Sequence, residues 1–544
     1  MTSNGERSKA KQFQGDEGGY RPRRRSSEDS ANKQRSRKPK EGKREQKDGF
    51  EDRNGFKKTG KRGRSEDNRR GRSHDDRRGR SGYNRPQFEK QSSSSTRDTS
   101  ARFHARVSPA RRVAIDALTS LFEEDAFLQP VLSSLAAQAQ LSPVDRRLAW
   151  ELVLGISRRW GSLIAHLDEL LSKGTESLPP EVLRALVLGA YQLVYLDKIP
   201  AYAAINESVS LAKECDHKYA GLVNKILKVI MENGLPEIKK LSGLNKLAAE
   251  LSHPQWWVKA QLKQYGREQT KKIAEANNNP APLAIRFAPQ FDHQTVYDQL
   301  RAEGAKLTPL TWAKGGYALD VKRPFALPSH REGLWYVQDE ASQLVSLLLA
   351  PKAGDRVWDV CAAPGGKSLT ILEQLGPEGQ LLSTDLHERK AQELAARLVA
   401  FPQATVCQHD AVKGAPNTQQ QVFDKILLDA PCSALGVIRR HPEIRWRRTP
   451  KDVTKAAKKQ RKLLEAVALH LKVGGTLVYS VCTDTEEEST QIIDDFLLAF
   501  PEFVIDSPTK GDQVWDQLYH DKLSLNAADH GTDGFFAVKL TRVR

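Results

Sequence analysis

The stretch RVWDVCAAPGGKS, residues 356–368, decides the fold of this 544-residue chain. An apolar run ends at Asp359, and a loop of small residues with two adjacent glycines leads from it into a helix pattern. A strand that passes through such a loop into a helix is typical of an open parallel α/β sheet. The small residues let the backbone approach a ligand where the helix amides point outward. Because the loop matches neither GxxxxGKS nor GxGxxG, it does not predict a polyphosphate site.

Strand, loop and helix patterns repeat after this stretch. Further candidate strands are QLLSTD, ATVCQHD, DKILLDA and GTLVYSVC, with helix patterns between them. Strands that alternate with helices in this way predict a doubly wound parallel sheet over residues 336–544. The last apolar run, GFFAVKL at residues 534–540, follows a long loop, and we expect it to pair as an edge strand.

Three acidic residues stand at or beside the ends of successive strands, namely Asp385, Asp410 and Asp429. Asp385 follows Gly366 by roughly 20 residues, the spacing at which a strand-end acid binds ribose hydroxyls in nucleotide-binding folds. A single strand-end Asp would more often cap a turn or a helix. Three such acids after a glycine-rich first loop favour a nucleoside-type cofactor without a polyphosphate.

The chain ahead of the sheet has a different pattern. From residue 105 apolar residues recur at helical spacing, as at Ile115, Leu118 and Phe122. SPVD, residues 142–145, is a helix start with a capping Ser, a Pro in the first turn and an early acid. With no strand pattern present, residues 105–236 predict an all-helical domain. Residues 237–335, which contain a Pro-rich break, predict a small connecting α/β region.

Positive charge is concentrated near the amino terminus. The first hundred residues hold 30 Lys and Arg against 16 Asp and Glu, which accounts for 14 of the net charge of +17. Because aliphatic residues are scarce there, residues 1–104 cannot bury enough apolar surface to offset the entropy of ordering, and we expect a disordered basic tail. Its repeats RGRSEDNR, RGRSHDDR and RGRSGYNR suit a polycation that binds phosphates, and they suit a solubility tail equally well.

Composition also argues against several classes of protein. No apolar core follows the first basic residues, as a secretory signal would need, and no apolar run is long enough to span a bilayer. The five cysteines show no CxxC pair or zinc-ligand spacing, so we expect separate thiols, a reducing cytoplasm and no metal. The absence of PCxxC argues against a zinc nucleobase deaminase.

Several stretches resemble known families. VYLDKIPAYAAINESVSLAK and GLVNKILKVI resemble the NusB antitermination fold, a small helical bundle that binds RNA. CAAPGGK, DAPCSALG, YSVCT, GVIRRHPEIRW, LKVGGTLVYS and DGFFAVKL resemble the motifs of RNA cytosine-5 methyltransferases of the Fmu/Sun type. The similarity extends over nearly everything after residue 105. It is strongest to the members with a NusB-like front half, which act on 16S rRNA.

This resemblance implies a Rossmann-like methyltransferase sheet, preceded by an all-α NusB-like bundle and the disordered basic tail. It implies S-adenosyl-L-methionine as the cofactor, with Asp385 on the ribose and with Asp410 and Asp429 near the adenine and methionine parts. The loop that it implies around the cofactor consists of Cys361, Ala362, Ala363, Pro364, Gly365, Gly366 and Lys367.

Two cysteines, Cys432 and Cys482, stand just past strands at the same sheet edge. Methylation of cytosine at carbon 5 needs a nucleophile that adds to carbon 6 and a group that handles the proton on carbon 5. Chemistry alone does not rank the two thiols, and DNA cytosine-5 methyltransferases use the cysteine of a Pro-Cys pair, which would favour Cys432. The resemblance to the RNA enzymes implies instead that Cys482 is the nucleophile and that Cys432 assists release. The chain departs from their Thr-Cys motif because Val481 precedes Cys482, which removes one neighbouring hydroxyl.

The segment IRRHPEIRWRRTPK, residues 438–451, follows the Cys432 loop and interleaves cations with an aromatic residue. Such a mixture can clamp phosphates and stack on a base, although a solvated lid would have the same composition. Its position beside the predicted active site favours RNA contact. The predicted RNA-binding residues are Arg439, Arg440, Arg445, Trp446 and Arg447.

The sequence therefore predicts a cytoplasmic, monomeric enzyme that methylates carbon 5 of a cytosine in 16S rRNA through a cysteine adduct on carbon 6. Because a base inside a helix hides carbon 6, the target should be unpaired or flipped out. Two alternatives stay open: methylation of tRNA or another rRNA site, and a non-catalytic RNA-binding factor in ribosome assembly. Two positioned thiols argue against the second alternative.

Overall fold

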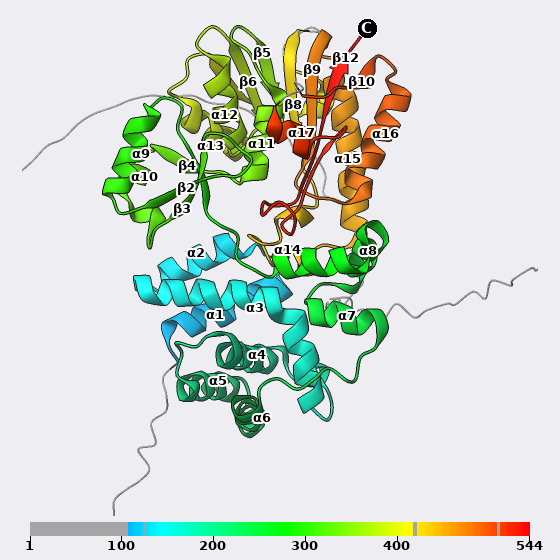
Figure 1. The fold of residues 1–544 in the computed structure, drawn as a ribbon. Helices are drawn as coiled ribbons and strands as arrows, with labels where there is room; N and C mark the ends of the chain where they lie inside the picture. The colour runs from blue at the N-terminus through cyan, green and yellow to red at the C-terminus, as the bar shows by residue number, and fades with distance from the viewer. Residues whose placement is uncertain (1–106, 125, 417–421, 509–511) are drawn as a thin grey trace, which may run out of the picture. The chain divides into compact units, whose positions relative to one another are not determined.

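The computed structural model describes residues 107–544 apart from 125, 417–421 and 509–511 (Figure 1). The predicted disordered tail, residues 1–104, lies outside the described residues. The described residues belong to one structural unit, in which a helical part is followed by two α/β parts. None of the described helices is long and apolar enough to cross a membrane.

The helical part forms where the sequence predicts it. Helix α3 begins at the SPVD start, where the Ser142 side chain accepts a hydrogen bond from the amide of Asp145 at 3.1 Å. The short helix α2 buries one narrow stripe of Leu128, Leu132 and Ala136. The helices are α1 (Pro109–Glu123), α2 (Leu128–Gln138), α3 (Pro143–Leu170), α4 (Pro180–Tyr195), α5 (Ala201–Cys215) and α6 (Ala220–Asn233).

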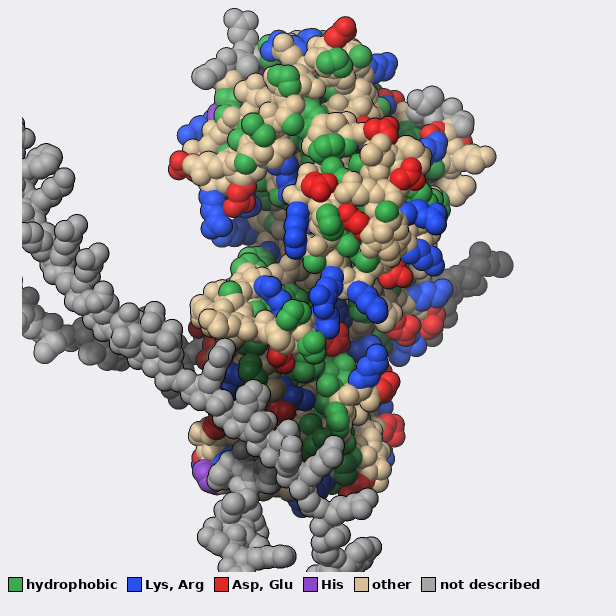
Figure 2. All heavy atoms as spheres, turned by 90° about the vertical axis from the view of Figure 1, so that its left-hand side faces the viewer, with side chains coloured by type: hydrophobic (Ala, Val, Ile, Leu, Met, Phe, Trp, Pro, Cys, Tyr) green, Lys and Arg blue, Asp and Glu red, His purple; other side chains and the backbone are tan. Residues whose placement is uncertain are grey.

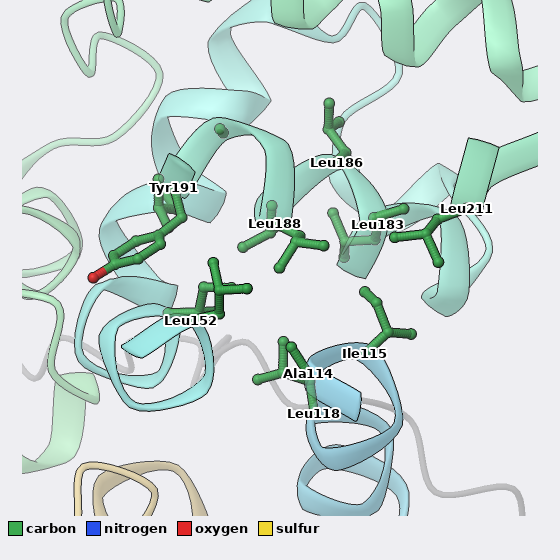
Figure 3. Packing of buried hydrophobic residues seen from close by; sticks show 14 of the residues in the cluster. Ala114, Ile115, Leu118, Leu152, Leu183, Leu186, Leu188, Tyr191 and Leu211 are labelled. Atoms are coloured by element: carbon green, nitrogen blue, oxygen red, sulfur yellow. The ribbon is translucent and has the colours of Figure 1, made fainter. Parts of the chain in front are cut away.

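The core of the helical part lies around α4. Every position of α4 from 182 to 192 is buried, because α1, α3, α5 and α6 all pack against this helix. Figure 3 shows Leu188 of α4, Leu152 of α3 and Ile115 of α1 among the side chains that fill the space between the helices. The apolar residues that recur at helical spacing in the sequence therefore pack into one continuous core.

A connecting part joins the helical part to the large sheet. It contains α7 (Gly243–Leu251), α8 (Gln255–Asn277), β1 (Ala284–Phe287), α9 (His293–Ala302), β2 (Lys306–Pro309), β3 (Gly316–Asp320), α10 (Pro328–Arg331) and β4 (Trp335–Val337). Strands β1 to β4 form an antiparallel sheet in the order β2-β3-β1-β4. Val296 and Leu300 of α9 share a buried cluster with Ile285 and Phe287 of β1, so this helix covers the sheet.

The large sheet confirms the predicted doubly wound architecture. In the described residues its strand order is β10-β12-β9-β8-β5-β6-β7, and the strands from β7 to β9 are parallel. Its first elements are α11 (Glu340–Leu349), β5 (Arg356–Asp359), α12 (Gly366–Leu375), β6 (Gln380–Asp385), α13 (Glu388–Leu398), β7 (Ala404–Gln408) and β8 (Phe423–Asp429). There follow α14 (Ile444–Arg447), α15 (Pro450–Ala468), β9 (Leu471–Val481), α16 (Thr490–Ala499), β10 (Phe503–Ile505), α17 (Gln513–Leu518), β11 (Leu523–Leu525) and β12 (Phe535–Arg542).

Helices cover both faces of this sheet (Figure 1). Val357 of β5 and Leu427 of β8 point to the face covered by α11, α12 and α13. Their chain neighbours Trp358 and Ile426 point to the other face, where α15 and α16 pack. Because side chains alternate along a strand, strands buried on both faces read as continuous apolar runs.

The expectation of an edge position for the last strand is wrong. Strand β12 pairs antiparallel with β9 on one side and with β10 on the other, and β11 also pairs with it. Its residues are buried on both faces, with Phe535 and Ala537 on one and Phe536 and Val538 on the other. The apolar run alone does not specify which strand lies beside it, so the interior position depends on the tertiary fold.

Candidate active site

The loop after β5 forms a tight turn at the amino end of α12. Gly365 has φ of 96°, in the left-handed region that favours glycine, and α12 begins at Gly366. A Cβ at Gly365 would lie 2.8 Å from a methyl group of Leu394 and 3.0 Å from Arg397, both in α13. The absence of a side chain therefore lets α13 pack against the loop while the amides of α12 stay directed at the sheet edge.

Asp359 lies behind this loop with its carboxyl group fully buried. Its Oδ2 accepts a hydrogen bond from the Ser368 hydroxyl at 2.6 Å, while its Oδ1 has no partner among the described residues. Burial raises the pKa of Asp359 to about 7. An unpaired buried oxygen at this edge is a position where a polar ligand group can bind.

The three strand-end acids reach the same edge because their strands, β6, β7 and β8, run parallel in one sheet. Asp385, at the end of β6, is buried and accepts a hydrogen bond from the amide of His387 at 3.0 Å. Asp410 follows β7 and caps a short 3-10 turn by accepting from the amide of Val412 at 3.3 Å. Asp410 therefore has the capping role that is common for a single strand-end Asp, together with its position at the edge.

Asp429, at the end of β8, is held from two sides. The ammonium of Lys367 lies 2.7 Å from its Oδ2, and the hydroxyl of Ser480 in β9 donates to its Oδ1 at 2.8 Å. Burial disfavours the charge on Lys367, but the neighbouring Asp429 outweighs this effect and raises the pKa of Lys367. The pair thus brings a lysine from the cofactor loop and an acid from the DAPC motif into one fixed contact.

The two thiols lie side by side. The sulfur atoms of Cys432 and Cys482 are 3.1 Å apart, although the residues follow different strands. Their hydrogen bond, together with burial, raises the pKa of Cys432 well above its ordinary value. A third cysteine, Cys361 in the cofactor loop, has its pKa raised to about 12, mainly by burial. The sequence-predicted catalytic residues are therefore brought together at one end of the sheet.

Two glycines hold the backbone around Cys482. The amide of Gly436 donates to the carbonyl of Cys482 at 3.0 Å, and the amide of Gly534 donates to the carbonyl of Gly436 at 2.8 Å. A Cβ at Gly436 would lie 2.0 Å from the carbonyl oxygen of Gly534. Only glycine allows this close approach, which links the loop after β8 to the start of β12.

One residue of the site escaped the sequence-based analysis. Glu488 is fully buried, and its carboxylate accepts hydrogen bonds from the Ser433 amide at 2.8 Å, from Gln460 at 3.0 Å and from the Thr485 hydroxyl at 3.0 Å. It thereby ties the loop of Cys432 to the segment after Cys482 and to α15. In the sequence it is one of three consecutive glutamates, and nothing local distinguishes it from Glu487.

The side chains of the arginine segment make many contacts within the chain. Arg445 is 1% exposed, and its guanidinium donates to the carbonyl of Ser252 at 2.9 Å and to Asn278 Oδ1 at 2.7 Å. Trp446 donates from its indole to the carbonyl of Ser157 in α3 at 2.7 Å. The donors of Arg445 are thus engaged by buried protein acceptors, which argues against direct RNA contact through this side chain.

Arg439 and Arg440 are also bound within the chain. Arg440 forms ion pairs with Asp339 at 2.6 Å and with Asp533 at 2.7 Å. Arg439 is mostly buried and donates to the carbonyl of Gly531 at 2.8 Å. Both side chains thus join the segment to the loops around the large sheet, and their charges are already matched by protein groups.

A cavity of about 470 Å³ lies apart from the two thiols. The guanidinium of Arg447, the remaining predicted RNA contact, lies nearby at 3.8 Å from the centre of the Phe127 ring. None of the strand-end acids or thiols lines this cavity, so it is not the predicted cofactor site. The lining residues are Phe127, Gln129, Pro130, Ser133, His441 and Glu443.

Comparisons with known proteins match this architecture along the chain. The family model described as 16S rRNA methyltransferase RsmB/F matches residues 346–541. Models of the NusB family and of an RsmF/B-like ferredoxin-like domain match residues 108–232 and 253–326. The probable ribosomal RNA small subunit methyltransferase B of Bacillus subtilis is 34% identical over 442 residues, which are 79% of this chain and 98% of that protein. The chain belongs to the RsmB/F family of methyltransferases.

Other relatives agree with this family. The ribosomal RNA small subunit methyltransferase B of Escherichia coli O1:K1 is 34% identical over 436 residues, covering 79% of this chain and 98% of that protein. The crystal structure of the protein PH0851 superimposes with a TM-score of 0.66 at 23% identity, over 80% of this chain and 99% of that one, which shows a shared fold. The predicted NusB-like and Rossmann-like architecture is thereby confirmed.

As an RsmB/F methyltransferase the chain uses S-adenosylmethionine, as the sequence predicted, and the residues present fit this molecule. Asp385 is an acid at the end of the second strand, which suits a ribose diol. The loop of small residues and the unpaired oxygen of Asp359 suit a polar amino acid part. Within the described residues, no group of three or more His, Cys, Asp or Glu could hold a metal ion.

Proposed function

We propose that the chain transfers a methyl group from S-adenosylmethionine to carbon 5 of an unpaired cytosine in 16S rRNA, through a covalent bond between Cys482 and carbon 6. The observation that carries this proposal is the 3.1 Å separation of the Cys432 and Cys482 sulfurs, at the sheet edge that also holds the loop after β5 and Asp429. A fold that only bound RNA would not need two adjacent thiols there.

The chemistry explains why a nucleophile is needed. Carbon 5 of cytosine is a poor nucleophile until a thiolate adds to carbon 6, which makes carbon 5 electron-rich. When bound, the cofactor supplies an electrophilic methyl group to that carbon. The proton on carbon 5 then has to leave, and the bond between sulfur and carbon 6 has to break.

The protonation of Cys432 supports a role for this residue in proton transfer. Since the pKa of Cys432 is raised well above its ordinary value, Cys432 keeps its proton near neutral pH. It can donate that proton to the Cys482 sulfur when Cys482 leaves carbon 6. We therefore propose Cys482 as the attacking group and Cys432 as the group that assists release.

The cofactor assignment follows the strand ends. In this proposal the loop of residues 361–367 surrounds the methionine part, Asp385 binds the ribose, and Asp410 lies near the adenine. Asp429 and its partner Lys367 face the region between cofactor and base, where Asp429 is placed to hydrogen-bond the cytosine edge. The spacing of the acids along neighbouring parallel strands supports this arrangement.

The remaining features of the proposal concern the whole chain. We propose a cytoplasmic monomer with the divisions 1–104, 105–236, 237–335 and 336–544, in which the NusB-like part contributes to RNA binding. The relatives named for small-subunit rRNA support 16S rRNA as the substrate. A reducing compartment suits a mechanism that needs both thiols unoxidised.

The test uses Cys482→Ala and Cys432→Ala with unmodified small-subunit rRNA and S-adenosylmethionine. We expect Cys482→Ala to lose methyl transfer by roughly 10³-fold or more, since it lacks the nucleophile. Cys432→Ala should accumulate a covalent RNA adduct, seen as a slow band on a denaturing gel. Cys215→Ala, at an exposed cysteine in α5, is the matched control and should behave like the wild type.

Each outcome of this experiment decides a point. If the adduct accumulates with Cys482→Ala and not with Cys432→Ala, Cys432 is the nucleophile and Cys482 assists release. Substantial turnover by Cys482→Ala would refute the nucleophile. Nucleoside analysis of the product identifies the methylated atom. If the protein methylates tRNA and does not methylate small-subunit rRNA, the substrate is tRNA.

A further inference from the structure

Helix α15 carries lysines along one face. Five lysines occur at spacings of three and four residues, which puts them on one side of the helix. All five side chains are exposed, and in the described part of the chain none has a carboxylate within ion-pair distance. The lysine stripe consists of Lys451, Lys455, Lys458, Lys459 and Lys462.

The opposite face of α15 fastens the helix to the active site. Gln460 is buried and donates to the carbonyl of Pro431, the residue before Cys432, at 3.0 Å. Helix α15 also lies near the cofactor loop, because its Ala457 packs against the same buried cluster as Cys361 and Cys432. The helix that carries the stripe is therefore anchored to the loop of Cys432.

A merely solvated helix face would have a different charge pattern. Helix α13 covers the other face of the sheet and carries charges of both signs, including the ion pair of Arg389 with Glu393 at 3.0 Å. Figure 2, which shows the side of the protein that carries α9 and α10, also shows Lys and Arg interspersed with Asp and Glu. Like charges at a spacing of four residues destabilise a helix, so the lysine stripe carries a cost that mixed charges avoid.

In the described part of the chain, neither acid of α15, Asp452 or Glu465, forms an ion pair with a lysine of the stripe. Asp452 forms the capping box at the helix start. Its carboxylate accepts hydrogen bonds from the amide of Thr449 at 2.9 Å and from the hydroxyl of Thr449 at 2.8 Å. The other basic residue of the helix, Arg461, forms an ion pair with Asp495 of α16. The lysines are thus left as a continuous positive surface.

We infer that the lysine stripe binds the phosphate backbone of the RNA segment that delivers the target base to Cys482. This inference rests on the proposed function and names a surface for its substrate. The stripe runs along the helix for about 17 Å, since each residue adds about 1.5 Å, which is long enough for several successive phosphates. Lysine is a mobile point charge that suits backbone contact without sequence reading.

The same inference accounts for the arginine segment. The sequence places both the arginines and the lysines just after the Cys432 loop, and only one of the two groups is free to meet RNA. Arg445 and Arg440 are bound by protein acceptors, whereas the lysines one to five turns further along the chain are exposed. The positive charge predicted beside the active site is therefore supplied by α15.

The test compares three full-length proteins: the wild type, the variant K455Q/K458Q/K462Q, and the control R301Q/K306Q/K390Q. The control removes the same charge from exposed cations of α9, β2 and α13. Binding of unmodified small-subunit rRNA is measured over a series of salt concentrations. Residues 1–104 contribute equally to all three proteins, so the differences report the substituted positions.

For the lysine variant we expect roughly 10-fold weaker RNA binding at low salt. Each lost phosphate contact reduces the slope of log affinity against log salt by about 0.7, so three contacts reduce it by about 2. The control should keep the wild-type slope. Cofactor binding by calorimetry and the methylation rate at saturating RNA should stay unchanged in the lysine variant, because the active site is intact.

An unchanged slope in the lysine variant, or an equal loss in the control, would overturn the inference. A lower methylation rate at saturating RNA with unchanged binding would also overturn it, since the lysines would then act on chemistry. The proposed function can fail while this inference holds. That would be the outcome if the lysine variant shows the reduced salt dependence of RNA binding but the wild type produces a methylated nucleoside other than 5-methylcytidine.

Discussion

Asp359 ends β5 with a carboxyl group that no solvent reaches. Burial is the main cause that raises its pKa to about 7, while the hydrogen bond from Ser368 and the charge of Lys367 oppose the rise. Asp429 and Asp385, at the ends of the neighbouring strands, add to it. At the scale of single residues the cofactor edge thus combines several acids, of which one is kept close to neutral by its surroundings.

We expect Asp359→Asn to remove a pH dependence of stability. Because the pKa is about 7 in the folded chain and 3.8 is the ordinary value, the folded chain holds this proton more tightly than the unfolded chain. Its stabilising effect is complete below about pH 4 and is lost as the pH rises to about 7. In urea titrations, the free energy of unfolding of the variant relative to that of the wild type should therefore rise from about pH 5 to about pH 8, by roughly 2–4 kcal/mol. A difference that does not vary with pH would contradict the raised pKa.

Among the elements, the loop after β8 and the start of β12 depend on each other. Gly436 and Gly534 approach so closely that a Cβ at Gly436 would meet backbone atoms of Gly534 and of Cys482. Backbone atoms cannot rotate away as a flexible side chain can, so the loop would have to shift. A shift here moves the carbonyl of Cys482, to which the Gly436 amide donates.

Gly436→Ala should therefore lower the rate of methyl transfer by roughly 10-fold or more, because misplacement of the thiol by a fraction of an ångström impairs attack. Stability should fall by about 1–3 kcal/mol from the steric overlap. Cofactor binding should persist, since the loop after β5 is separate. Gly221→Ala in α6, where a Cβ has no neighbour within 4 Å, is the control and should not lose activity. Wild-type kinetics in Gly436→Ala would show that the loop adapts.

For the whole molecule, the segment between β8 and α15 connects the catalytic loop to the helical part. Arg448 donates to the carbonyl of Ser433, next to Cys432, at 2.9 Å. Two residues earlier, Trp446 packs so closely on α3 that a Cβ at Gly161 would lie 2.8 Å from its ring. Neighbouring residues of this one segment thus contact both the loop of Cys432 and the helical part.

Arg445→Gln tests this structural role against RNA contact. Loss of the guanidinium leaves several buried carbonyl acceptors without donors, which should lower the free energy of unfolding by about 3 kcal/mol in urea titrations. The salt dependence of RNA binding should stay that of the wild type. Arg389→Gln, at a side chain that is 90% exposed, is the matched control and should leave stability nearly unchanged. An unchanged stability with a salt slope reduced by about 1 would restore Arg445 as a phosphate contact.

The sequence by itself determined the local structure and the family of this protein. The helix start at Ser142, the alternation of strands and helices, and the turn at Gly365 depend on periodicity and on the backbone preferences of residues close in the chain. CAAPGGK, DAPC and YSVC could be recognised for the same reason, because each motif is contiguous. Both thiols and the strand-end acids were therefore found without the structure.

Only the tertiary structure decided which of these residues meet and which are buried. The 3.1 Å contact of Cys432 with Cys482, the hydrogen bonds of Glu488 with Ser433 and Gln460, and the interior position of β12 join segments that are far apart in the chain. The sequence reads an arginine as a positive charge wherever it lies. The structure buries Arg445 among backbone carbonyls and leaves the lysines of α15 in solvent, because burial and hydrogen bonding depend on which segments the fold brings together.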